Sequence, residues 1–226
     1  MRISSTVISG AVAAVAVAGS ANAGVVDQFT TAQSFGTNSS YTTISGSIFE
    51  ERNARRSNNA GGTGVSATNN NVAFTFARGG GSASSVVLNY QMSGAAATDL
   101  SSIAEMSIVL SNLVLNVAGG TAATGVKIDW SLMDSSGNTL FASDTRSTNG
   151  TSIFNFASAS FDDGFDLTQV EMLSLRVTQV GGSTSGTYSN TSSTGTLSNF
   201  SYTAVPAPGA LALLGAAGLV GARRRR

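Results

Sequence analysis

Apolar and polar residues alternate in short segments along most of this chain, and this period-two pattern restricts the fold more than any other feature of the sequence. Residues 72–76 place Val72, Phe74 and Phe76 on one face, and residues 125–133 place apolar side chains at every second position. A period of two is the spacing of side chains along one face of a β-strand. The pattern therefore predicts a protein built almost entirely from strands.

Turn-forming residues separate the alternating segments at short intervals. Residues 134–138 (DSSGN) lie between alternating segments at 125–133 and 139–143, and this arrangement predicts a hairpin. Many short strands joined by Gly-, Asn- and Ser-rich turns are typical of an all-β, antiparallel β-sandwich. We expect a jelly-roll-like arrangement of about eight to ten strands, with an immunoglobulin-like sandwich as the alternative.

Two segments depart from simple alternation. Between residues 106 and 117 the apolar positions change phase near Ser111 and Asn112. This shift predicts a β-bulge at that point, or a strand that passes between sheets. Residues 50–56 (EERNARR) are the most charged stretch before the C-terminal end. We interpret them as a solvated loop or a short helical turn with weak local ion pairs.

One pattern occurs twice, at residues 99–110 and 166–177. Both copies read Asp-Leu-[Ser/Thr]-x-[Ile/Val]-x-x-[Met/Leu]-Ser-[Ile/Leu]-x-[Leu/Val]. The Asp is placed to cap a single helical turn, and a strand follows. We interpret the copies as two equivalent corners of a double-layered β fold, with chance similarity as the alternative.

The composition removes several kinds of chemistry. The chain has no cysteine and no histidine, and its only lysine, Lys127, lies at an outward position of an alternating segment. Disulfides, cysteine nucleophiles, Ser-His-Asp triads and ordinary zinc sites are excluded. Trp130 is in phase with core positions, so we assign it to the core. We predict no catalytic residue and no enzyme.

Carboxylates are the remaining candidates for a site. Asp162, Asp163 and Asp166 cluster around Gly164, and oxygen-rich loops of this kind can hold Ca²⁺. The spacing does not match an EF-hand, and Asp is more often a turn or capping residue. We predict no cofactor, with Ca²⁺ at these three residues as one alternative and glycoside cleavage by an acid pair as another.

The chain ends in three segments of different chemistry. A proline turn at 205–208 precedes an uncharged run of small and apolar residues at 209–222, and four arginines close the chain. The turn is Val205, Pro206, Ala207 and Pro208, and the arginines are Arg223, Arg224, Arg225 and Arg226. A helix over this run is roughly 21 Å long, shorter than the ~30 Å hydrocarbon core. We expect a short transmembrane helix whose arginines snorkel on the cytoplasmic side.

This three-part tail resembles the PEP-CTERM sorting signal of bacterial exosortase substrates. The resemblance covers residues 205–226, and Ala207 stands where that family has its central Glu. It implies recognition by an exosortase-like membrane enzyme, cleavage near the proline motif, and release of the body to the cell surface or extracellular matrix. A permanent inner-membrane anchor is the alternative.

The other end of the chain has the features of a secretory signal peptide. Arg2 precedes an apolar run at 7–18, and Ala21 and Ala23 form an A-x-A site. We expect the secretion machinery to export the chain and signal peptidase to cleave it before Gly24, so that residues 1–23 are the signal.

Residues 24–204 remain as one β-sandwich domain. Five of the chain's twelve basic residues lie in the two terminal segments, whereas all twelve acidic residues lie in this body, which therefore carries about −5. A net charge of this sign argues against nucleic acid or anionic lipid as a partner.

Together these features predict an exported structural or adhesive protein of the cell surface or extracellular matrix, sorted by its C-terminal signal. The alternative function is a carbohydrate-binding β-sandwich module, assisted by Ca²⁺ in one variant, with extracellular polysaccharide as its partner.

Overall fold

The structure is a computed structural model. It describes residues 23–34, 40–57, 64–68, 70–78, 85–115, 123–181 and 191–205. The apolar run of the signal peptide and the tail from Pro206 onward lie outside these residues, so the signal helix, the transmembrane helix and the sorting motif stay predictions. No helix in the described ranges has the length and hydropathy that crossing a bilayer requires.

The described body is built from two seven-stranded sheets in which all strand pairs are antiparallel. Sheet A contains β1 (Ala23–Asp27), β2 (Gln33–Ser34), β5 (Gly64–Thr68), β6 (Asn71–Arg78), β8 (Ile103–Leu115), β11 (Gly150–Asn155) and β14 (Thr191–Ala204). Sheet B contains β3 (Thr42–Thr43), β4 (Glu51–Ser57), β7 (Ser85–Gln91), β9 (Ala123–Asp134), β10 (Thr139–Arg146), β12 (Ser160–Phe161) and β13 (Val170–Gly181). Two 3₁₀ turns, η1 (Ser93–Ala95) and η2 (Leu167–Gln169), complete the described elements. The predicted antiparallel β-sandwich is confirmed.

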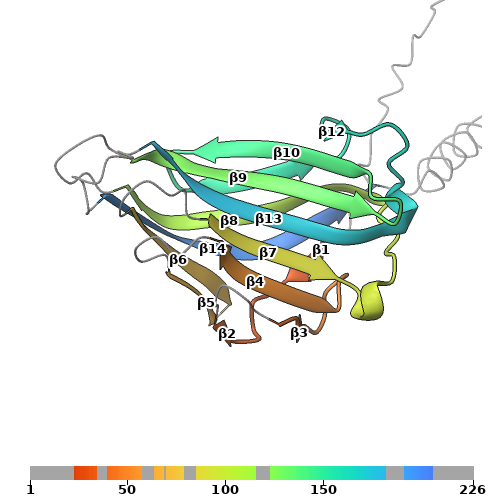
Figure 1. Cartoon of the computed structure of the whole chain (residues 1–226), viewed down its shortest axis with the longest axis horizontal. Coiled ribbons are helices and arrows are strands. Elements are labelled where there is room, and N and C mark those ends of the chain that lie inside the picture. Colours follow the sequence, from red (N-terminus) through yellow and green to blue (C-terminus); the bar gives the residue numbers. More distant parts are fainter. Residues whose placement is uncertain are drawn as a thin grey trace, which may run out of the picture. The chain divides into compact units, whose positions relative to one another are not determined.

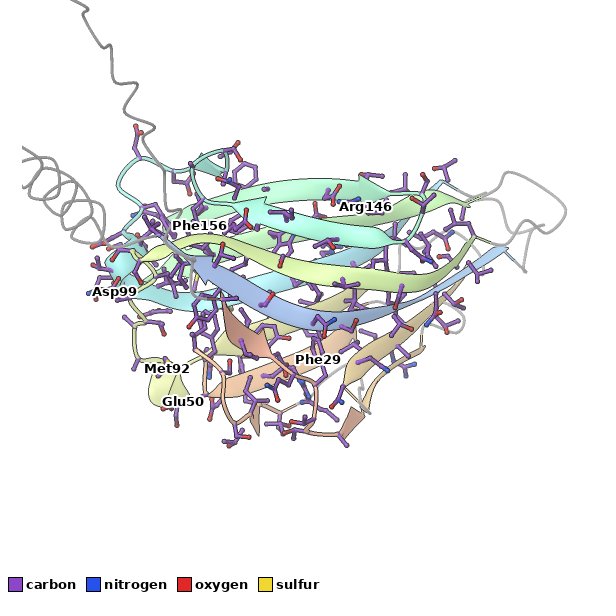
Figure 2. All side chains as sticks on the ribbon, turned by 180° about the vertical axis from the view of Figure 1, so that it is seen from behind. Phe29, Glu50, Met92, Asp99, Arg146 and Phe156 are labelled. Carbon is purple, nitrogen blue, oxygen red and sulfur yellow. The ribbon has the colours of Figure 1, made fainter. Side chains whose placement is uncertain are left out.

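The two sheets pack as two layers. Sheet B lies in front in Figure 1, in the order β12-β10-β9-β13-β7-β4-β3. Figure 2 shows the opposite side, where the long blue strand β14 runs through the middle of sheet A. Strand β8 pairs with one edge of β14, and β6 and β1 pair end to end with the other edge.

The core fills the space between the sheets with the inward residues of the alternating segments. Val72, Phe74 and Phe76 are all buried, as predicted. Trp130 is also buried, and its ring stacks on that of Phe154, with 5.6 Å between the centroids and 10° between the planes. The predicted core position of Trp130 is therefore confirmed.

The hairpin and the bulge are also where the sequence places them. Strands β9 and β10 pair across the turn at residues 134–138, where Gly137 has a φ of 85°. In β8 the register with β14 shifts between Ser111 and Val114, and Asn112 has a φ of 51°. A residue with positive φ and a shifted register are the marks of a bulge, which explains the change of apolar phase.

The interpretation of residues 50–56 as a solvated loop or helical turn is wrong. Residues 51–57 form strand β4, which pairs with β7 inside sheet B. Arg52 points into the core and is 0% exposed, and Ala54 beside it is buried as well. The high local density of charge suggested a solvent-exposed segment, but the charge of Arg52 is neutralised inside the core by a residue from another part of the chain.

The two copies of the repeated pattern meet at one end of the sandwich. Asp99 precedes β8 of sheet A and accepts a hydrogen bond from the Ser101 amide, whereas Asp166 precedes β13 of sheet B and accepts one from the Thr168 amide. The Leu100 amide donates to the Leu167 carbonyl at 2.8 Å. The copies are therefore equivalent corners that contact each other, although only Asp166 caps a 3₁₀ turn.

Candidate functional site

Five strands of sheet B bring their outward side chains into rows that cross the sheet. In register across β10, β9, β13, β7 and β4, one row contains Phe141, Ser131, Ser174, Asn89 and Asn53. The next row contains Ser143, Asp129, Arg176, Val87 and Arg55. Strands lie about 4.8 Å apart, so each row is roughly 19 Å long. We call the surface formed by these two rows the outer B face.

A pocket of about 410 Å³ lies at the β10 end of this face. Its lining residues come from β9, β10 and β13 and are Lys127, Asp129, Trp130, Ser131, Phe141, Ala142, Ser143, Ser174 and Arg176. Phe141 is 49% exposed, whereas Trp130 is buried. The pocket therefore combines one exposed aromatic ring with hydroxyl and charged groups.

Of the charged groups that the structure describes in this pocket, Lys127 and Asp129 form an ion pair, whereas Arg176 does not. Lys127 Nζ lies 2.7 Å from Asp129 Oδ1, and the Ser143 hydroxyl donates to the same oxygen at 2.6 Å. Arg176 is exposed and forms none of the ion pairs found among the described residues. A guanidinium with free donors is thus presented beside a carboxylate that is already satisfied.

A second exposed aromatic residue lies at the opposite edge of the sheet. Tyr41 precedes β3 and is 37% exposed. Partial burial raises the pKa of its phenol, while the charges of Arg55 and Glu51 on β4 act on it in opposite directions. Thr42, the next residue, pairs with Arg52 of β4, so Tyr41 lies beside β4 and aromatic rings stand at both ends of the outer B face.

Sheet A has a pocket of about 360 Å³ where β1 and β6 meet end to end along β14. Its lining residues are Val25, Asp27, Gln28, Thr30, Asn70, Asn199, Phe200 and Ser201. Asn70 and Asn199 have φ values of 65° and 49°, a backbone conformation in which Asn is enriched. The carboxylate of Asp27 at this pocket is committed to partners in the core.

Those partners form a buried polar cluster between the sheets. Asp27 Oδ2 accepts from Arg52 Nη1 at 2.6 Å and from the Tyr90 hydroxyl at 3.1 Å, and Asp27 Oδ1 accepts from the Phe29 amide. Arg52 also donates to the carbonyl of Thr31. Sequence analysis missed this cluster, because its members are separated by up to 63 positions and no local pattern connects them.

Two of the three candidate calcium ligands, Asp162 and Asp166, accept hydrogen bonds from neighbouring residues. Asp162 accepts from the backbone and hydroxyl of Thr139, and Asp166 accepts from Thr168. Asp163 is exposed. Within the described ranges no group of three or more Asp or Glu is arranged to hold a metal ion. Calcium at these three residues stays an untested alternative to the prediction of no cofactor, and the hydrogen bonds of Asp162 and Asp166 stabilise turns.

Asp134 is the acidic side chain that organises this end of the sandwich. It is buried and accepts hydrogen bonds from the amides of Ser136, Asn138 and Asp166 and from the Asn138 side chain. Burial by itself raises the pKa of the Asp134 carboxyl, but these hydrogen bonds outweigh it and hold the pKa below its usual value. The carboxylate thus joins the β9–β10 turn to the start of η2.

The fold and its surface define a two-layered antiparallel β-sandwich with a polar, aromatic-flanked sheet face. No family model matches the chain, and no curated protein matches it. Solved structures do show likeness. The family 11 carbohydrate-binding module of the cellulosomal cellulase Lic26A-Cel5E of Clostridium thermocellum is 13% identical, with 82% of this chain and 96% of that chain covered and a TM-score of 0.42.

Two further likenesses are weaker in coverage. The agarase AgWH50C is 10% identical over 67% of this chain, with a TM-score of 0.42, and the chain spans only 23% of the agarase. A carbohydrate-binding module from the β-sandwich superfamily is 9% identical, with 74% of this chain and 62% of that chain covered and a TM-score of 0.39. Likeness at this level assigns no family.

Proposed function

We propose that this protein is an exported, non-catalytic β-sandwich that binds extended polysaccharide on its outer B face. The observation that carries the proposal is the row structure of that face. Outward Ser, Asn, Asp and Arg side chains lie on the strands on either side of β7, whose own members of the rows, Asn89 and Val87, are 9% and 7% exposed, and exposed aromatic rings stand at the two ends of the face.

Such a surface fits the chemistry of an extended glycan. A polysaccharide chain presents a line of hydroxyl groups, and each can exchange hydrogen bonds with amide, hydroxyl and charged side chains. The apolar faces of sugar rings can pack on exposed aromatic rings such as Phe141 and Tyr41. A sheet holds its outward side chains on rigid strands, so little conformational entropy is lost on binding.

The absence of catalysis is part of the proposal and rests on the available groups. Cleavage of a glycoside by an acid pair requires two carboxyl groups about 5 to 9.5 Å apart across the bond. The pocket on the outer B face is lined by one carboxylate, Asp129, and that of sheet A by another, Asp27. Asp129 is paired with Lys127, and Asp27 with Arg52.

We further propose that the two terminal segments determine where binding takes place. The signal at residues 1–23 would export the body, and the tail at 205–226 would present it to an exosortase-like enzyme in the inner membrane before display at the cell surface or in the matrix. Deletion of residues 205–226 followed by cell fractionation tests this. Unchanged surface display would overturn the sorting role but not the binding role.

A binding experiment tests the face itself. The full chain, purified in mild detergent, is screened on a glycan array with and without Ca²⁺, and Phe141→Ala is compared with wild type on the glycans that bind. Loss of ring packing should weaken binding about 2- to 10-fold. Ile153→Ala is the matched control, because Ile153 is 51% exposed but lies on β11 of sheet A. Equal loss in both variants, or no binding, would overturn the proposal.

A further inference from the structure

Two arginines on the outer B face flank the same residue. Arg176 of β13 and Arg55 of β4 are the direct cross-strand neighbours of Val87 on β7, one on each side. Both arginines are exposed, while Val87 is only 7% exposed although it occupies an outward position. The aliphatic stems of the arginines can cover Val87 and leave the guanidinium groups in solvent.

The acids near this pair are already occupied. Asp129, the other cross-strand neighbour of Arg176, accepts from Lys127 and Ser143. Glu51, four positions before Arg55 on β4, accepts from the Gln91 side chain at 2.9 Å. None of the ion pairs among the described residues includes either arginine. The middle of the face therefore carries two cations without a matching anion, in a body whose net charge is negative.

The spacing of the pair is that of a repeating ligand. Two strand steps separate Arg55 from Arg176, which places their backbones roughly 10 Å apart along the row. This is about the length of a disaccharide unit in an extended polysaccharide. Anionic groups on alternate sugars would thus reach the two guanidinium groups in turn, and each guanidinium can bind a carboxylate or sulfate through two parallel hydrogen bonds.

A neutral glycan would use this face poorly. It would strip water from two guanidinium groups and return no countercharge, which is unfavourable. We infer that the outer B face takes an acidic polysaccharide, with carboxylate or sulfate groups seated on Arg55 and Arg176. This inference rests on the proposed glycan-binding function and names the class of ligand. The negative body repels a polyanion at long range, so the attraction is local and should weaken as salt is added.

Calorimetric titration of the full chain with two matched pairs of polymers tests the inference. Polygalacturonate is compared with its fully methyl-esterified form, and cellulose sulfate with cellohexaose. We expect at least one acidic polymer to bind about 10-fold more tightly than its neutral match, since hydrogen bonds to charged groups are the stronger ones. The two acidic polymers distinguish carboxylate from sulfate.

Single substitutions test whether Arg55 and Arg176 are the residues that bind the acidic groups. Arg55→Gln and Arg176→Gln should each weaken acidic binding about 10-fold, whereas binding of the neutral polymers should stay the same or become tighter. Arg146→Gln is the matched control, because Arg146 is already paired with Asp144. Equal affinity for acidic and neutral polymers would overturn this inference and leave the proposed function intact. If the preference for acidic polymers survives in both variants, Arg55 and Arg176 are not the residues that bind the acidic groups. If no polymer binds, both the acidic-ligand inference and the proposed glycan-binding function are overturned.

Discussion

Arg52 Nη1 lies 2.6 Å from Asp27 Oδ2, and this ion pair joins strand β4 of sheet B to strand β1 of sheet A in the middle of the core. The side chains are 0% and 3% exposed. Hydrogen bonds from Tyr90 and to Thr31 satisfy further polar atoms of the pair. Among the described strands β1 pairs with β14 alone, and the ion pair thereby gives β1 a second attachment across the sandwich.

Replacement of Asp27 by Asn should cost about 3–5 kcal/mol of unfolding free energy, because it leaves the Arg52 charge buried without a countercharge. Urea unfolding measures the loss. Asp144→Asn is the matched control, because it breaks the ion pair between Asp144 and Arg146, which is similar in length but has side chains about 30% exposed. This change should cost under about 1 kcal/mol. The double variant Asp27→Leu, Arg52→Met should recover much of the loss. Equal effects of Asp27→Asn and Asp144→Asn would contradict this account.

Tyr90 gives the same cluster an alkaline pH dependence. Burial, followed by the charge of Asp27, raises the pKa of its phenol well above 10.0. The folded state therefore retains a proton that the unfolded chain releases, so the contribution of Tyr90 is complete below about pH 10 and is lost as the pH rises beyond that value. In urea unfolding, Tyr90→Phe should be less stable than wild type at neutral pH by about 1–3 kcal/mol. The difference in unfolding free energy should narrow above about pH 10. If it stays constant across the pH range, Tyr90 is not the source of an alkaline pH dependence.

Asp134 should give stability a pH dependence opposite in sign to that of Tyr90. Its folded pKa is lowered, so its stabilising effect is present above the unfolded carboxyl pKa of about 3.9 and is lost as the pH falls through the folded value. Asp134→Asn places an NH₂ group against backbone donors and should lower Tm at neutral pH. The gap to wild type should shrink below about pH 4. Asp163→Asn, at an exposed turn position, is the control, and an equal fall in its Tm would refute the prediction.

The alternation of residues was sufficient to predict the layered β fold, since it reports directly which side chains face the core. It also located the hairpin around Gly137 and the bulge at Asn112, because both depend on local chain geometry. It failed at β4, where Arg52 occupies an inward position. A buried charge is tolerated only where a distant residue neutralises it, and the sequence around Arg52 contains no sign of Asp27.

The candidate site was less predictable than the fold. Alternation assigned Lys127 to an outward position, and the structure confirms it, because the Lys127 side chain is 42% exposed. It could not show that Arg176 and Arg55 flank one valine, because that arrangement depends on the strand order β13-β7-β4. Pairing between strands far apart in sequence is a property of the whole sheet, so a surface built across five strands becomes visible only in three dimensions.

Gly195 tests how tightly the middle of sheet A is packed. It is buried in β14 opposite Phe74 of β6, and a Cβ at this position would overlap the Phe74 ring. The ring is itself buried against Phe76, with 5.3 Å between the centroids, so it has little room to move. Gly195→Ala should therefore cost about 1–3 kcal/mol in urea unfolding.

A second glycine separates steric overlap from backbone strain. Gly137 has a φ of 85° and no atom near its would-be Cβ, so Gly137→Ala should be destabilised by its left-handed backbone alone. Asn tolerates this conformation, and Gly137→Asn should recover stability. At position 195 only a smaller partner can help, because the backbone there is an ordinary strand. Adding Phe74→Leu to Gly195→Ala should cost less than Phe74→Leu costs in the wild type. If the two substitutions simply add, the ring of Phe74 is not what excludes a side chain at position 195.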